Sequence, residues 1–187
     1  MSQAAADGSR PVVLVTGASR GIGRSAALAF AAAGLDVAVN YSSSEEQAAK
    51  VVAEVEGLGA RAVAVRADVA NDAAVRAMVA EVQAAYGRLD VVIANAGTTI
   101  DTVPTDLEGV SVEEWDRVFA VNVRGIFLTA RASVPLLRES PIASIVTSCS
   151  VAGIRPGPQP LPYAASKAAV VNLTKTLAGA LGPTIRV

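Results

Sequence analysis

Histidine is absent from this chain of 187 residues, and cysteine, aromatic side chains and net charge are scarce. The absence of histidine excludes His-based catalytic triads and His-ligated metal sites. The single cysteine, Cys149, cannot form an internal disulfide, so we expect a reducing compartment. The net charge of −1 and the scatter of basic residues argue against a surface for nucleic acid or anionic membranes.

Long apolar runs are missing as well. None approaches the roughly eighteen residues that a membrane-spanning helix needs. Residues 1–10 are small and polar and lack the apolar segment of a signal peptide. We therefore expect a disordered tail over 1–10 and a soluble, cytoplasmic protein.

Small and apolar residues dominate the remainder of the chain. Apolar residues make up 52% of the sequence and charged residues 18%, a balance that suits an α/β protein whose sheet is buried on both faces. The length, and the lack of a linker or internal repeat, predict a single domain over 11–187.

Apolar runs too short for helices alternate with helical patterns along the chain. We predict strands at 12–15, 37–40, 62–65, 89–95 and 144–148, and the opening of a sixth strand at 184–187. The predicted helices cover 22–33, 45–58, 71–86, 111–137 and 163–181. This alternation implies right-handed crossovers and a parallel sheet.

The first strand ends in the glycine-rich turn TGASRGIG at 16–23, after which an Ala-rich helix begins. A strand, a glycine turn and a helix in this order can hold a dinucleotide pyrophosphate at the helix N-terminus. Taken alone, the turn fits equally well a tight strand-to-helix connection without a ligand.

Tyr163 and Lys167 are four residues apart in a helical pattern and therefore share one face. A neighbouring ammonium group favours the phenolate and lowers the tyrosine pKa from its usual value near 10. The pair could therefore transfer protons. The same spacing also occurs on ordinary amphipathic helices.

Three further polar residues are candidates for chemistry. Ser150 follows the fifth strand at its carboxyl end, where open α/β sheets bind ligands, and its hydroxyl could hydrogen-bond a substrate carbonyl. Ser148 competes for this role, and either serine could simply cap the strand end. Asn122 lies between two valines in the long helix and could face the sheet, where its amide would need partners.

Together these segments resemble the short-chain dehydrogenase/reductase family. TGASRGIG at 16–23 is similar to its TGxxxGIG turn, NAG at 95–97 to its NAG segment, and YAASK at 163–167 to its YxxxK motif. Ser150 and Asn122 fall where the family has its catalytic serine and asparagine. The resemblance covers 11–187 and implies a Rossmann-type, doubly wound parallel sheet of strand order 3-2-1-4-5-6, with helices on both faces.

The resemblance also implies roles for the candidate residues. Tyr163 would be the general acid that protonates the carbonyl oxygen, and Lys167 would lower its pKa and hold the nicotinamide ribose. Ser150 would polarise the substrate carbonyl, and Asn122 would hold a water molecule in a proton relay. Asp68 would accept a hydrogen bond from the adenine amino group.

The charge pattern favours NADP(H) as the cofactor. A Rossmann site that prefers NAD places a carboxylate at the end of the second strand. Here that end reads NYSS at 40–43, and Asp36 precedes the strand and so lies at the wrong end. Arg20 is placed to meet a 2′-phosphate, to which Ser42 or Ser43 could hydrogen-bond.

These arguments give one set of cofactor-binding residues and no metal site. The set is Gly17, Ser19, Arg20, Gly21, Ile22, Gly23, Asn40, Tyr41, Ser42, Ser43, Asp68, Val69, Asn95, Ala96 and Gly97, together with Tyr163 and Lys167.

The expected function is NADP(H)-dependent reduction of a ketone or 3-oxoacyl-type carbonyl to a secondary alcohol, or the reverse, by hydride transfer. ASRGIG and NYSS make the 3-oxoacyl-[acyl-carrier-protein] reductase branch the most similar one. Two alternatives stay open. One is a non-catalytic NADP-binding sensor or partner protein of the same fold. The other is a methyltransferase or another Rossmann-like binder, in which a YxxxK helix would not be expected.

The end of the chain and one strand residue depart from the family pattern. Ala94 stands where the family often has a further asparagine, which would cost one structural hydrogen bond. Family members continue beyond a sixth strand, so we expect the domain to be incomplete at its C-terminus. The resemblance further implies a homo-oligomer, a dimer or a tetramer, formed through the helices at 111–137 and 163–181.

Overall fold

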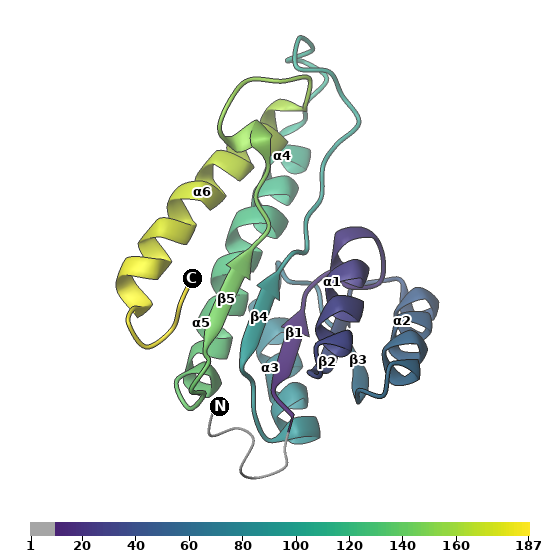
Figure 1. The fold of residues 1–187 in the computed structure, drawn as a ribbon. Coiled ribbons are helices and arrows are strands. Elements are labelled where there is room, and N and C mark those ends of the chain that lie inside the picture. The colour runs from purple at the N-terminus through teal and green to yellow at the C-terminus, as the bar shows by residue number, and fades with distance from the viewer. Residues whose placement is uncertain (1–9) are drawn as a thin grey trace.

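The computed structural model describes residues 10–187. Its centre is a five-stranded parallel sheet with helices on both faces (Figure 1). Of the predicted tail over 1–10, residues 1–9 lie outside the described residues, and the Arg10 guanidinium binds the Gly59 carbonyl oxygen at 2.6 Å. The strands are β1 (Val12–Val15), β2 (Asp36–Tyr41), β3 (Ala62–Arg66), β4 (Val91–Ala94) and β5 (Ser144–Thr147).

Six α-helices connect and extend these strands in the part of the chain that is described. They are α1 (Gly21–Ala32), α2 (Glu45–Gly57), α3 (Asp72–Tyr86), α4 (Val112–Phe119), α5 (Gly125–Leu137) and α6 (Leu161–Leu181). A π-helical segment, η2 (Ala120–Arg124), joins α4 to α5, and a 3₁₀ turn, η3 (Val151–Gly153), follows β5.

The strands lie in the order β3-β2-β1-β4-β5, which confirms the doubly wound Rossmann topology over these five strands. The core has two halves because successive side chains of β1 point to opposite faces of the sheet. Val12 and Leu14 pack in the half formed with α3 and α5, whereas Val13 and Val15 pack in the half formed with α1 and α2. Burial on both faces explains why the strand reads as a continuous apolar run.

Several element ends differ from the sequence prediction by one or two residues, and three differences bear on the fold or the site. The predicted sixth strand is a single parallel bridge between Ser144 and Arg186, so the described sheet has no sixth named strand. The last helix starts at Leu161 instead of Tyr163, because Pro162 fits the first turn of a helix, where its missing N–H is not needed. The predicted helix over 111–137 is interrupted by η2.

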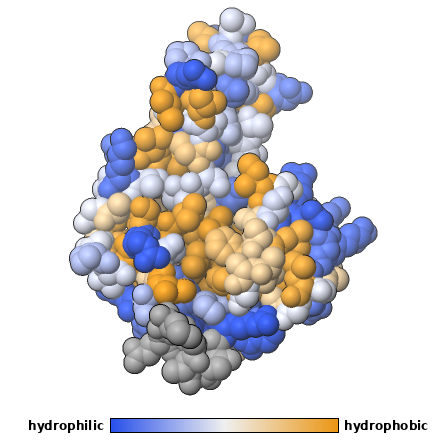
Figure 2. Space-filling view, viewed as in Figure 1, coloured by the Kyte–Doolittle hydropathy of each residue, from blue (hydrophilic) through white to orange (hydrophobic). Residues whose placement is uncertain are grey.

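The viewed face of the molecule carries apolar residues in the middle of the sheet region and hydrophilic residues over α2 at the right margin (Figure 2). Val146 on β5 is 50% exposed, in contrast to the fully buried residues of β1. Among the described helices, none combines the length and the apolar character needed to cross a membrane.

Candidate active site

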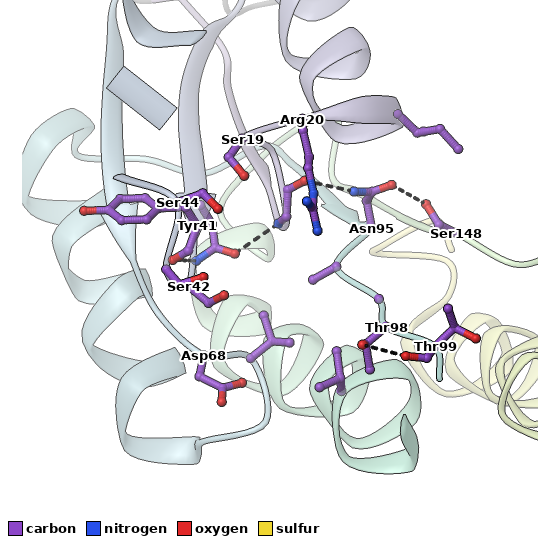
Figure 3. Close-up of a pocket in the computed structure, with 18 of the residues that line it drawn as sticks. Ser19, Arg20, Tyr41, Ser42, Ser44, Asp68, Asn95, Thr98, Thr99 and Ser148 are labelled. Atoms are coloured by element: carbon purple, nitrogen blue, oxygen red, sulfur yellow. Dashed lines mark hydrogen bonds between the residues drawn. The ribbon is translucent and has the colours of Figure 1, made fainter. Parts of the chain in front are cut away.

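A pocket of about 500 Å³ opens at the carboxyl ends of the strands (Figure 3). It lies where the chain order of the strands reverses around β1, the place where open α/β sheets bind ligands. All predicted cofactor-binding residues line it except Gly21 and Gly23, the first and third residues of α1. Of the four predicted catalytic residues, Tyr163 and Lys167 line the pocket, and Asn122 and Ser150 do not.

The glycine turn forms one wall of the pocket and leaves no room for side chains at two positions. Gly17 has a φ of +62°, and a Cβ there would lie 2.9 Å from the Cα of Ala96. A Cβ on Gly23 would lie 2.6 Å from Asn95 Nδ2 and would also meet the Gly17 carbonyl oxygen. Within the described chain no side chain caps the N-terminus of α1, so its first N–H groups can face an anion.

Two predicted ligand residues, Asn40 and Asn95, use their amide groups within the protein. Asn40 Oδ1 accepts a hydrogen bond from Gly17 N at 3.1 Å, and its Nδ2 donates to the carbonyl oxygens of Val65 in β3 and of Ala67 just after it. Asn95 Nδ2 donates to Thr16 O at 3.0 Å, and its Oδ1 accepts from Ser148 Oγ at 3.2 Å. Both asparagines therefore shape the walls of the pocket by holding the glycine turn.

Asp68 lies at the far end of the pocket from the Tyr163–Lys167 pair. Its Oδ1 accepts from Ala70 N and its Oδ2 from Arg117 Nη1, each at 2.9 Å. Partial burial opposes ionisation of Asp68, but these two hydrogen bonds outweigh it and hold the pKa of the carboxyl below its ordinary value. The pocket therefore contains a fixed carboxylate.

Tyr163 and Lys167 lie on one face of α6 at the opposite end. Lys167 is only 5% exposed, and its Nζ lies 5.6 Å from the centre of the Tyr163 ring. Lys167 Nζ donates to Ser148 O at 2.7 Å, which fixes the ammonium group at the end of β5. Burial lowers the pKa of Lys167, and the neighbouring Cys149 acts in the opposite direction. The ammonium is thus positioned to act on the phenol.

Asn122 lies in the π-helical segment and is completely buried. Its Oδ1 accepts from Thr98 N at 2.8 Å, and its Nδ2 donates to Thr98 O at 2.9 Å and to Ser166 Oγ at 3.0 Å. The amide joins the chain after β4 to α6 and does not reach the pocket. Irregular π-helical turns of this kind recur at functional sites.

Ser150 lies just outside the pocket, at the N-terminus of η3, where its Oγ accepts from Ala152 N at 3.2 Å. The competing candidate, Ser148, lines the pocket and donates its hydroxyl proton to Asn95. Ser150 keeps its own proton available for a substrate, because a hydroxyl can accept one hydrogen bond and donate another.

Comparison with known proteins identifies the family of the chain. Residues 11–187 match the profile of the short chain dehydrogenase family. The chain belongs to this family. A curated relative, the 3-oxoacyl-[acyl-carrier-protein] reductase of Synechocystis sp., is 42% identical over 167 residues, which are 89% of this chain and 66% of the relative. The chain thus spans just under two thirds of the length of that relative.

Solved structures agree with this assignment to the short-chain dehydrogenases. A Burkholderia xenovorans protein described as a short-chain dehydrogenase/reductase superposes with a TM-score of 0.92 at 39% identity, covering 97% of this chain and 76% of that one. A short chain dehydrogenase from Burkholderia cenocepacia, solved in complex with NADP, has a TM-score of 0.85 at 40% identity, covering 95% and 70%. One from Burkholderia phymatum, solved with NAD, has a TM-score of 0.84 at 34% identity, covering 92% and 60%.

Three residues of this short-chain dehydrogenase site were not predicted from the sequence. Arg117 lines the pocket, and nothing in its helical surroundings distinguishes it from a solvent-exposed arginine. Thr16 Oγ1 accepts from the backbone N–H groups of residues 95 and 96, both at 3.0 Å. Gly153 packs against the backbone of α6 at Lys167. Within residues 10–187 there is no group of three or more potential metal ligands.

Proposed function

We propose that this chain is an NADP(H)-dependent oxidoreductase that reduces a ketone or 3-oxoacyl-type carbonyl to a secondary alcohol, or catalyses the reverse oxidation. The observation that carries the proposal is the buried Lys167 ammonium, 5.6 Å from the ring of a tyrosine that lines the pocket. A phenol hydroxyl held beside an ammonium group can exchange a proton with a bound substrate, so Tyr163 is the proposed general acid and base.

The pocket is suited to a dinucleotide. At Gly17 and Gly23 the backbone is too crowded for a Cβ, and the N-terminus of α1 presents N–H groups to the same space. Such an arrangement binds a pyrophosphate through backbone donors and the helix dipole. When bound there, NADP(H) would supply or accept the hydride.

The charges at the rim favour NADP(H) over NAD(H). Figure 3 shows Arg20 reaching from the glycine turn into the pocket, which Ser42 also lines. The only acid of β2 is Asp36, which lies at its other end and binds Arg61 Nε at 2.6 Å. Arg20 would therefore meet the 2′-phosphate, and Ser42 and Ser43 would donate hydrogen bonds to it.

The chain's own residues would then move the proton. In the reductive direction Tyr163 would donate its hydroxyl proton to the carbonyl oxygen, and in the oxidative direction the phenolate would take the proton from the alcohol. The hydroxyl of Ser150, which accepts a hydrogen bond from Ala152 N, would donate its own proton to the same oxygen. Asn122 would have a structural role, since its amide holds the chain after β4 against α6.

The substrate class rests on the relatives. The Synechocystis relative is named as a 3-oxoacyl-[acyl-carrier-protein] reductase, and we extend that class of carbonyl substrate to this chain. We treat residues 11–187 as one NADP-binding catalytic domain and propose a cytoplasmic location, which suits the single Cys149. Cell fractionation that finds the protein elsewhere would refute the location.

The replacement Tyr163→Phe tests the mechanism, because it removes the transferred proton and keeps the ring. We expect NADPH oxidation with a panel of ketones to fall by at least about 10²-fold, while NADPH binding stays within a few-fold of wild type. Turnover that survives the replacement refutes the mechanism. A wild-type chain that binds NADPH but turns over no ketone supports the alternative of a non-catalytic NADP-binding sensor or partner protein.

We also propose that the protein is a homo-oligomer. The outer side of α4, η2, α5 and α6 carries a groove of about 770 Å³ whose apolar lining includes Phe119, Val123, Phe127 and Leu173. Phe127 is 42% exposed, and a second copy of the chain would bury it. Light scattering that finds only a monomer at working concentrations would contradict this proposal.

A further inference from the structure

The end of the pocket at Asp68, where the proposed cofactor would place its adenine, contains an ion pair that the proposed reaction does not use. Arg117 reaches from α4 to the segment after β3, where its Nη1 binds Asp68 Oδ2 at 2.9 Å. The two residues are 49 positions apart in sequence, and both line the pocket. The arginine thus connects a wall of the pocket to a helix that otherwise lies outside it.

Two further arginines bind the same segment from the same helical run. Arg124 Nη2 donates to Ala70 O at 3.2 Å, and Arg131 Nη2 donates to Asp72 Oδ1 at 2.6 Å. With Arg117 they form a series at seven-residue spacing, and neither of the other two lines the pocket. All three arginines bind the segment of residues 68–72, but only Arg117 lines the pocket. Replacement of one of the other two therefore serves as a control.

The contacts of Asp68 show what Arg117 contributes there. The Ala70 N–H holds one carboxylate oxygen and the Arg117 guanidinium holds the other, so the side chain has one orientation. Each carboxylate oxygen can still accept a second hydrogen bond. An acceptor that is already oriented binds a ligand donor at a lower entropic cost than a rotating one.

We propose that Arg117 is a positioning residue that orients the Asp68 carboxylate toward the adenine half of the dinucleotide. The inference rests on the proposed NADP(H) site and goes beyond it, because it assigns a role to a residue of α4. It requires that Arg117 act through Asp68 and not by contact with the ligand.

The test uses isothermal titration calorimetry with three probes on the full chain. The probes are NADPH, adenosine 2′,5′-bisphosphate for the adenine half, and reduced nicotinamide mononucleotide for the other half. In Arg117→Ala we expect affinity for the first two probes to fall by about fivefold, the size of a partly exposed charged pair. Affinity for the mononucleotide should not change. The matched control, Arg131→Ala, should alter all three affinities by less than about twofold.

A double-mutant cycle with Asp68→Ala decides whether the effect passes through Asp68. In that background Arg117→Ala should weaken binding of the bisphosphate no further, because its partner is already gone. The inference would be overturned if the effects of Arg117→Ala and Asp68→Ala on the binding free energy were fully additive. It would also be overturned if Arg131→Ala lost as much affinity as Arg117→Ala, or if Arg117→Ala lost as much affinity for the mononucleotide as for the bisphosphate. A wild-type chain that binds none of the three probes would instead refute the proposed function, so the two failures are distinguishable.

Discussion

Asp90 is the residue whose removal we expect to affect stability most clearly without touching the pocket. It is fully buried before β4, at the amino end of the sheet, and its two carboxylate oxygens bind Val12 N, Ser140 Oγ and the Arg88 guanidinium at 2.6 to 2.8 Å. Burial alone would raise its pKa, but the hydrogen bonds from Arg88, Ser140 and Val12 lower it on balance.

Replacement of this residue, Asp90→Asn, should lower the free energy of unfolding by about 2 kcal/mol near neutral pH, because hydrogen bonds to a buried charge are lost. The folded pKa is lowered, so the stabilisation is present above the ordinary carboxyl pKa of about 4 and is lost as pH falls through the folded value. Urea unfolding at a series of pH values from 7 to 3 measures the free energy of unfolding of both proteins. The difference between wild type and Asp90→Asn should narrow on acidification, and a difference that widens would contradict the assignment.

Asp72→Asn serves as the control for Asp90→Asn. Asp72 also pairs with arginines, Arg76 and Arg131, but its side chain is exposed to solvent. Exposed pairs contribute little to folding, so this variant should unfold close to wild type.

At the scale of elements, the contact between η3 and α6 positions the proposed acid. A Cβ on Gly153 would lie 2.5 Å from the carbonyl carbon of Lys167 and 2.6 Å from its oxygen, so the two elements touch through backbone. The segment between β5 and η3 also provides Ser148 O, which binds the Lys167 ammonium. The distance between these elements therefore sets where Lys167 lies relative to Tyr163.

The variant Gly153→Ala should push η3 away from α6 and cost about 1 to 3 kcal/mol of stability, the usual penalty of overpacking. It should also reduce ketone reduction, because Lys167 loses its fixed position. Gly179→Ala, in α6 with nothing within 4 Å of the added Cβ, should be neutral or stabilising. Thermal unfolding measures stability, and NADPH-linked turnover measures activity. If the two variants had the same stability and the same activity, the contact between η3 and α6 would not position Lys167.

The elements themselves were largely predictable, and their interruptions were not. Buried parallel strands leave apolar runs in the sequence, and helix ends leave glycines and caps, such as Ser111 with Glu114, so these patterns could be read locally. Asn122, in the π-helical turn, binds Thr98 and Ser166, which lie 24 and 44 residues away in the sequence. No local pattern records such a contact.

The same limit applies to the site. The glycine turn and the Tyr163–Lys167 pair depend on local spacing and were predicted. The use of Asn40 to hold the turn, and of Arg117 to hold Asp68, depends on which strands become neighbours. The hydrogen-bond partners of these side chains became known only from the three-dimensional structure.

At the scale of the whole molecule, the strand order gathers distant segments at one edge of the sheet. Because β1 lies between β2 and β4, the glycine turn meets the loop after β2 on one side and residues 95–97 on the other. A ligand in this crevice would contact both halves of the sheet at once. Binding should therefore stabilise the folded chain as a unit, by an amount that depends on affinity.

This linkage allows the cofactor preference to be measured as stability. If Arg20 binds the 2′-phosphate, NADPH should raise the melting temperature of the wild type more than NADH does at the same concentration. A charge-assisted hydrogen bond of about 2 kcal/mol corresponds to roughly 4–8 °C for a chain of this size. In Arg20→Ala most of that difference should disappear.

The control Arg24→Ala alters an arginine of α1 that pairs with Glu54 outside the pocket, and it should retain the difference. Equal shifts with the two cofactors in the wild type, or an undiminished preference in Arg20→Ala, would refute the assignment of Arg20.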